Sequence, residues 1–138
     1  MIIDALLQFS ALQAVTASAP STNSVDLGIG KHGVGEQLIV AVGLASAMVG
    51  AGTIAVTAEF ADDVAFTSNV ESFSIGSFAA ASPAGAKAFQ HLPITKLKQR
   101  FFRLFYTVTG VVSASSFNAA IVKDVDAYEA YADAFTIS

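Results

Sequence analysis

The fold is decided by Arg100-Phe101-Phe102-Arg103-Leu104-Phe105-Tyr106-Thr107-Val108, which is apolar on both faces of the strand that it predicts. Side chains alternate across a strand, so one face carries the set expected of a core strand, Phe102, Leu104, Tyr106 and Val108. The opposite face carries a set that is unusual for contact with water, Phe101, Arg103, Phe105 and Thr107. We therefore predict that this second face is buried against another chain.

The composition indicates one domain with much of its surface covered. A chain of 138 residues suffices for one core and hardly for two. Hydrophobic residues make up 54% of the chain and charged residues only 13%, and the mean hydropathy is +0.60. The formal net charge of −4 argues against direct binding to nucleic acid. The absence of cysteine excludes disulfides and thiolate chemistry.

Two apolar segments raise the question of a membrane, and we expect no membrane partner. The run from Gln37 to Ala58 has no charged residue and is long enough to span a bilayer. Within it, however, Thr53–Phe60 alternates with the period of a strand, so two strands joined around Gly50-Ala51-Gly52 fit better. The N-terminus carries Asp4 where a signal peptide has basic residues, which favours a retained arm or a short helix.

Reading along the chain gives about eight candidate strands with frequent turns between them. They cover residues 12–18, 24–27, 36–44, 53–60, 71–78, 87–92, 98–109 and 115–122. The pattern predicts an all-β fold, a jelly-roll-like antiparallel β-sandwich that forms a single domain over residues 1–138. Residues 1–10 are expected to form an N-terminal arm. Residues 124–138 form an acidic C-terminal tail, in which aromatic residues could share one helical face or hold an extended segment in place: Tyr128, Tyr131 and Phe135.

The residues that could carry chemistry do not form a catalytic or metal-binding pattern. Gly28-Ile29-Gly30-Lys31-His32-Gly33 matches a dinucleotide-binding motif by its letters, but no βαβ unit surrounds it. His32 and His91 lack metal-ligand spacing to another ligand. Asp62-Asp63 and Asp124-Val125-Asp126 fall short of a calcium loop and fit solvated turns better. We therefore expect no catalytic residues, no cofactor and no bound metal, and no enzymatic activity.

Four of the seven cations lie close together, at Lys96, Lys98, Arg100 and Arg103. In an acidic chain, one basic strand end fits electrostatic docking onto an acidic protein surface. It fits equally well a solvated edge that prevents strand-to-strand aggregation. Our candidate interface residues come from this cluster, the outward phenylalanines and the apolar arm: Ile2, Ile3, Leu6, Leu7, Lys96, Lys98, Arg100, Phe101, Arg103 and Phe105.

Several segments along the chain form a recognisable set. They are Met1-Ile2-Ile3-Asp4-Ala5, Phe9-Ser10, Gln13-Ala14-Val15-Thr16-Ala17, Ser21-Thr22-Asn23, Asp26-Leu27-Gly28, Gly33-Val34-Gly35-Glu36, Arg100-Phe101-Phe102-Arg103-Leu104 and Tyr106-Thr107-Val108. Together they resemble the Bbp16-like family of small phage capsid cement (decoration) proteins. The resemblance runs nearly end to end, and it is loose only between Ala79 and Lys96.

The resemblance implies a jelly-roll protein that binds the outside of an icosahedral shell of HK97-like major capsid protein as a non-enzymatic clamp. Its partners would be the major capsid protein and further copies of itself, with a homodimer expected first and a trimer second. It would be made in the host cytoplasm and reside in the virion, on the outer surface of the capsid.

Two other classes of function stand beside this reading. A virion-surface attachment or carbohydrate-binding β-sandwich module would gather exposed aromatic residues in its loops, whereas here they lie mostly within strands. A cupin-type enzyme would need two histidines and a carboxylate close together on strands, and the spacing of His32 and His91 does not fit.

Overall fold

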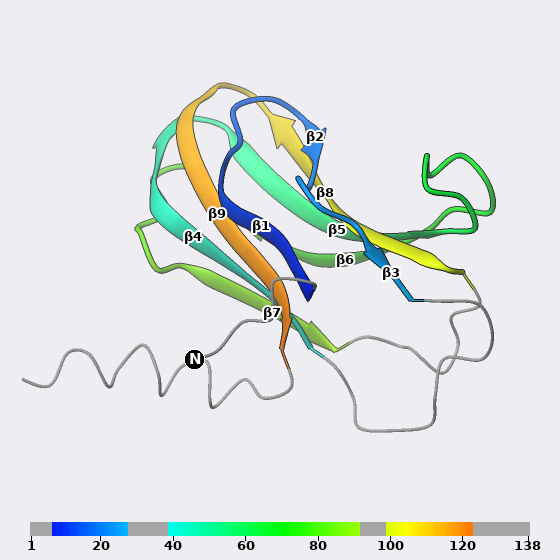
Figure 1. The fold of residues 1–138 in the computed structure, drawn as a ribbon. Coiled ribbons are helices and arrows are strands. Elements are labelled where there is room, and N and C mark those ends of the chain that lie inside the picture. Colours follow the sequence, from blue (N-terminus) through cyan, green and yellow to red (C-terminus); the bar gives the residue numbers. More distant parts are fainter. Residues whose placement is uncertain (1–6, 28–38, 92–98, 123–138) are drawn as a thin grey trace, which may run out of the picture.

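The computed structural model describes residues 7–27, 39–91 and 99–122, whose regular structure consists of antiparallel strands (Figure 1). In chain order they are β1 (Gln8–Ala14), β2 (Ala19–Pro20), β3 (Val25–Asp26), β4 (Ile39–Gly50), β5 (Thr53–Ala61), β6 (Glu71–Phe78), β7 (Lys87–His91), β8 (Phe101–Thr109) and β9 (Val112–Val122). These residues contain no helix with the length and hydrophobicity of a transmembrane span. The predicted all-β class is confirmed.

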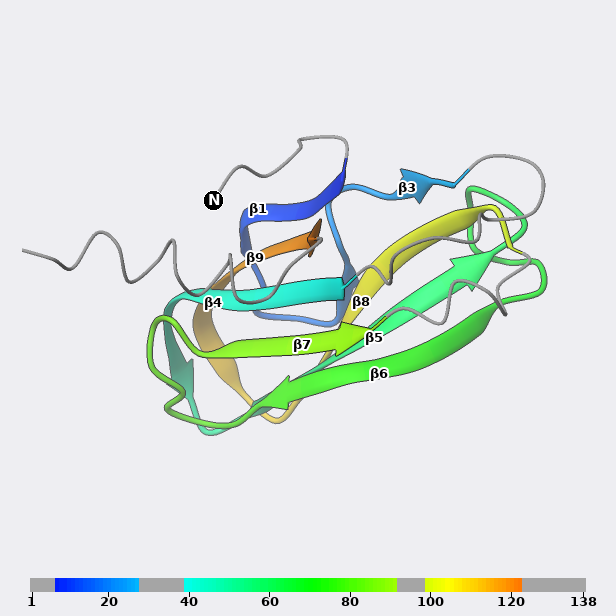
Figure 2. The same ribbon diagram turned by 90° about the horizontal axis from the view of Figure 1, so that it is seen from below.

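The strands form two sheets that pack as a sandwich (Figures 1 and 2). One sheet has the order β1-β9-β4-β7, and the other has the order β2-β8-β5-β6. β3 also pairs with β8, so β2 and β3 are two short pieces of one broken edge strand. With these two pieces taken together, the chain passes between the sheets in the order of a jelly roll, as the sequence predicts.

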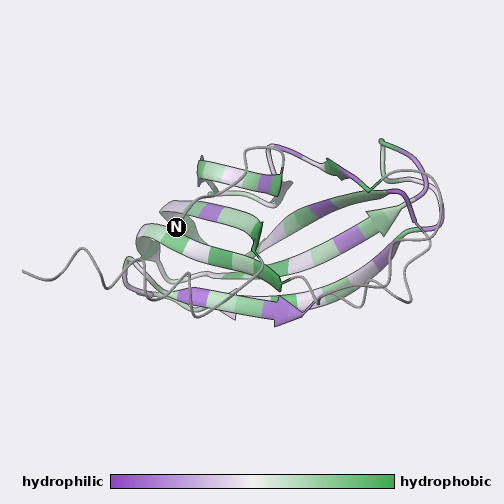
Figure 3. Ribbon diagram, turned by 60° about the horizontal axis from the view of Figure 1, so that its bottom comes forward, coloured by the Kyte–Doolittle hydropathy of each residue, from purple (hydrophilic) through white to green (hydrophobic). Residues whose placement is uncertain are grey.

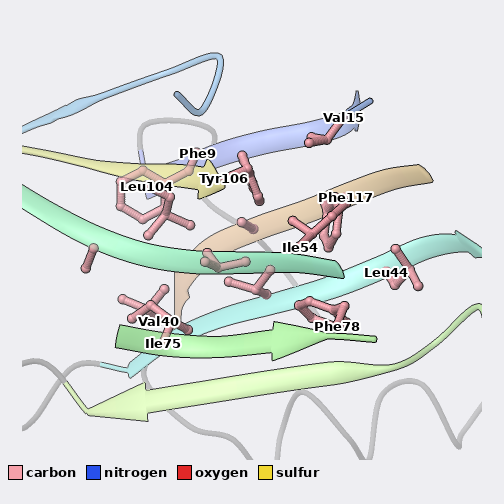
Figure 4. Packing of buried hydrophobic residues seen from close by; sticks show 14 of the residues in the cluster. Phe9, Val15, Val40, Leu44, Ile54, Ile75, Phe78, Leu104, Tyr106 and Phe117 are labelled. Atoms are coloured by element: carbon pink, nitrogen blue, oxygen red, sulfur yellow. The ribbon is translucent and has the colours of Figure 1, made fainter. Parts of the chain in front are cut away.

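The core lies between the two sheets and is built from alternate residues of each strand. On β5, Ile54, Val56, Ala58 and Phe60 point inward and are fully buried, as the period-two pattern predicts. The same alternation of apolar and polar residues runs along other strands (Figure 3). Phe102 lies between two other rings, with its centroid 4.6 Å from that of Phe9 and 4.3 Å from that of Phe60. Figure 4 shows members of this core, among them Phe9, Ile54 and Phe117, meeting between the sheets.

The N-terminal boundary differs from the prediction. The sequence pattern assigns residues 1–10 to an arm, but β1 begins at Gln8, and Phe9 and Ser10 are fully buried in the domain. The pattern also places this strand at residues 12–18, whereas β1 ends at Ala14. Leu12 has a positive φ of 51°, and the register with β9 shifts twice along β1, so the apolar alternation is broken here. Residues 1–6 and 124–138 lie outside the described residues.

Candidate protein interface

The outer face of β8 is the strongest candidate for a contact surface. Along this strand Phe102, Leu104 and Tyr106 are fully buried, and the residues between them are half-buried. The inward set belongs to the main core, and Figure 4 shows Leu104 and Tyr106 of this set between the sheets. The division of this strand into two faces is therefore as predicted. We call the outward residues and the two side chains that pack with them the β8 outer face: Phe101, Arg103, Phe105, Glu59 and Phe66.

Arg103, at the centre of this face, is held by its own chain. It lies directly opposite Glu59 of β5, and its Nε donates a hydrogen bond of 2.7 Å to Glu59 Oε2. The guanidinium carbon lies 4.2 Å from the ring centroid of Phe66 and 5.7 Å from that of Phe105. Both charged side chains are only about one-fifth exposed, at 22% and 19%. Glu59 therefore neutralises the charge of Arg103 within its own sheet.

The loop between β5 and β6 positions Phe66 over the arginine. The Asp63 carboxylate accepts hydrogen bonds from the Thr67 amide (2.8 Å), the Ser68 amide (2.9 Å) and the Thr67 hydroxyl (2.6 Å). These bonds, led by the one from the Thr67 side chain, lower the pKa of Asp63. Phe66 follows in the left-handed region at φ 55° and is 8% exposed. Asp62-Asp63 thus braces a loop, in line with the prediction of a turn.

A second ion pair closes one end of the face. Arg100 donates two hydrogen bonds to Asp26, from Nε at 2.8 Å and from Nη2 at 2.7 Å, and its guanidinium carbon lies 5.1 Å from the Phe101 ring centroid. The bond to Asp26 raises the pKa of Arg100. The pair is more exposed than the first, at 41% and 45%, so its contribution to stability is small. It fastens the edge piece β3 to the start of β8.

Beyond the aromatic centre, the same sheet carries short side chains. Phe105 is opposite Thr57, and Thr57 is opposite Ser74 on β6; one row further along, Ala55 is opposite Ser77. Directly opposed residues share a face of a sheet, so these side chains point outward with Phe105. The β8 outer face therefore presents partly exposed rings around an ion pair whose charges balance, and its side chains are already in place without a partner.

The other candidate residues fall into two groups. Lys96 and Lys98 of the basic cluster, and Ile2, Ile3 and Leu6 of the arm, lie outside the described residues. Leu7 is half-buried and packs against the core of its own domain, so it stabilises the sandwich directly.

The structure brings together no metal-ligating cluster in the part of the chain that it describes. Groups of three or more metal-ligating side chains are absent from this part. His91 is exposed at the end of β7, opposite Ile39. The glycine motif with His32 and the acidic triplet at residues 124–126 lie outside it.

The sequence model of the family Bbp16 matches residues 9–121, which run from β1 into β9. The chain belongs to the Bbp16 family. No curated protein matches the sequence. The match covers all the strands that carry the β8 outer face, so that face is part of the domain that defines the family.

Sequence reasoning missed the two residues that complete this face. Glu59 can be assigned to Arg103 only when the register between β5 and β8 is known, and β8 is far from β5 along the chain. Phe66 carried a weak signal, because it is a single aromatic residue in the loop between two predicted strands.

Proposed function

We propose that this Bbp16 family member is a phage capsid cement protein. It binds the outside of an HK97-like icosahedral shell and clamps neighbouring major capsid protein subunits, which stabilises the DNA-filled head. The proposal joins the resemblance of the chain to cement proteins with its membership of the family.

The β8 outer face is the observation that carries the proposal. Partly exposed aromatic rings on a rigid sheet are typical anchors of protein interfaces, because they bury much apolar area and lose little conformational entropy. Arg103 and Glu59 already form an ion pair and are largely buried, so binding of a partner removes little further water from their charged groups. The surface is thus suited to bury against a neighbouring protein.

The clamp acts by mass action. A protein that binds only the assembled shell stabilises that shell over its dissociated subunits, and many identical copies multiply the effect. Self-association follows the symmetry of such a shell, with a homodimer expected first and a trimer second. The protein would be made in the host cytoplasm and reside on the outer capsid surface of the virion.

Binding to purified particles tests this proposal. The protein should copurify with intact virions at a fixed ratio to the major capsid protein. Phe101→Thr and Phe105→Thr should each weaken its binding to expanded shells by about fivefold or more, as loss of an aromatic anchor does. Val111→Thr is the matched control, because this valine is 72% exposed in the turn between β8 and β9.

Two results would contradict the proposal. One is absence of the protein from virions. The other is shell binding that none of the β8 substitutions changes. Binding to a glycan that Phe105→Thr abolishes would favour the attachment or carbohydrate-binding module instead.

A further inference from the structure

Part of the outer face of the other sheet is buried as deeply as the core. Ile39 and Ala41 on β4 are 8% and 3% exposed, and Ala120 and Val122 on β9 are 3% and 8% exposed. The four form an apolar cluster of their own, against which Phe89 of β7 packs. We call these four residues the β4/β9 outer face.

The register places this cluster on the outside of the sandwich. Ile39 is opposite Val122 and Ala41 is opposite Ala120, so the four side chains share one face. Their neighbours along the strands belong to the main core on the other face: Val40, Val42, Ala119 and Ile121. The Ala41–Ala120 pair and Gly43 in the adjoining row give the middle of this face residues with short side chains or none.

Among the described residues, Phe89 of β7 packs against this cluster from the neighbouring strand. β1 and β7 lie beside β9 and β4 in the same sheet, and the second sheet lies on the inward side (Figure 2). The described strands therefore form no layer over this face. Four segments are available: residues 1–6, 28–38, 92–98 and 123–138.

We propose that residues 123–138 of the same chain dock on the β4/β9 outer face. β9 ends at Val122, which is itself part of the face, so this segment starts where its binding surface lies. Its aromatic residues are spaced by three and four, the spacing of one helical face: Tyr128, Tyr131 and Phe135. The short side chains of Ala41 and Ala120, and the lack of a side chain at Gly43, leave room for large aromatic rings to approach the sheet.

The other segments fit this face less well. Residues 28–38 contain glycine at Gly28, Gly30, Gly33 and Gly35 and offer little apolar bulk. Residues 92–98 carry two lysines. Residues 1–6 precede Leu7, which packs toward the main core between the sheets. Docking of the tail leaves the sandwich with one outer face covered by its own chain, so the β8 outer face remains for partners.

Cysteine labelling tests the proposal independently of capsid binding, because the natural chain contains no cysteine. Ala120→Cys places a thiol on the outer face, and Ala119→Cys places one in the core, where the alanine is 2% exposed. In the full-length chain both should react slowly with a thiol reagent. Replacing the three tail aromatics together with serine should speed labelling at position 120 by about tenfold or more and leave position 119 slow.

The matched control is Phe105→Thr, which removes a ring from the opposite outer face and should leave labelling of Ala120→Cys unchanged. An unchanged labelling rate after the triple tail substitution would overturn the proposal. A second result would also overturn it. If Ala120→Cys in the chain with its natural tail loses its protection from labelling on dilution, the face is covered by a second copy of the protein.

If the triple tail substitution also speeds labelling at position 119, the labelling rates no longer distinguish the outer face from the core. A disulfide experiment then tests docking of the tail directly. We expect Ala120→Cys to form an intrachain disulfide on mild oxidation with a cysteine at Ala130, Ala132 or Ala134 of the tail. Such a bond requires Cα atoms within about 7 Å. Ala55→Cys, on the exposed outer face of β5, should form none with the same tail positions. Failure of all three pairs with Ala120→Cys would refute docking of the tail.

Discussion

Leu104 and Phe105 are adjacent in β8 and face opposite environments, so they form a matched pair of probes. Leu104 is fully buried in the core, and Leu104→Ala should lower the free energy of unfolding by about 2–5 kcal/mol through lost burial and the cavity left behind. Phe105 is half-buried and contacts Arg103 on the outside. Phe105→Thr keeps a strand-forming residue and loses only part of a ring from contact, so it should cost about 1 kcal/mol or less.

Urea denaturation followed by far-ultraviolet circular dichroism measures these losses, because the chain has no tryptophan to report by fluorescence. Thermal melts give a second reading, at roughly 4 °C per kcal/mol for a domain of this size. The same two variants are then compared for binding to expanded shells. Phe105→Thr should weaken binding by more than about 1 kcal/mol.

The two measurements together separate a core position from an interface position. Equal losses of folding stability from Leu104→Ala and Phe105→Thr would refute the interface reading of β8, because both faces would then act as core. The interface reading of β8 would also be refuted if Phe105→Thr is stable and binds shells as well as the natural chain.

Three further outcomes follow from single contacts. The buried Tyr106 hydroxyl has its pKa raised from 10.0 to about 12, chiefly by desolvation, so the free energy of unfolding should fall between these pH values as the unfolded chain ionises first. Tyr106→Phe should remove that alkaline slope. Asp63 has a lowered pKa, so its contribution is present at neutral pH and is lost as the pH falls below the ordinary carboxyl value; acid unfolding of Asp63→Asn should show a shallower slope. Gly50→Ala should cost more than about 1 kcal/mol in denaturant unfolding, because φ is +119° and a Cβ would lie 2.4 Å from the Val111 carbonyl oxygen. Gly85→Ala, at φ +89° with no atom within 4 Å, should cost less.

Much of the fold could be predicted because a strand with one buried face produces alternating apolar and polar residues in the sequence. Thr53–Phe60 and Glu71–Phe78 were predicted within one residue of β5 and β6, since each buries one face and exposes the other. β4 was predicted to end at Leu44, yet it continues to Gly50. Its register with β9 shifts repeatedly after Leu44, and such bulges interrupt the period on which the prediction depends.

Less of the candidate site could be predicted, because its geometry depends on pairings between distant strands. The outward position of Phe101, Arg103 and Phe105 followed from alternation alone. The partners of the two arginines did not, since Asp26 and Glu59 meet them only through the β3–β8 and β5–β8 registers. The basic cluster was therefore predicted to be a docking surface or a solvated edge, whereas the fold pairs Arg100 and Arg103 of this cluster with acids of the same chain.

These ion pairs change the expected character of docking. A free arginine would steer an acidic partner, and its effect would fall with salt. Arg103 instead is fixed between Glu59 and Phe66, so its charge is balanced and its side-chain conformation is already set. What the face can still contribute is the apolar area of Phe101 and Phe105, presented on a sheet that needs no reordering. Affinity then comes from burial of preorganised rings, which suits a protein that must hold a finished shell.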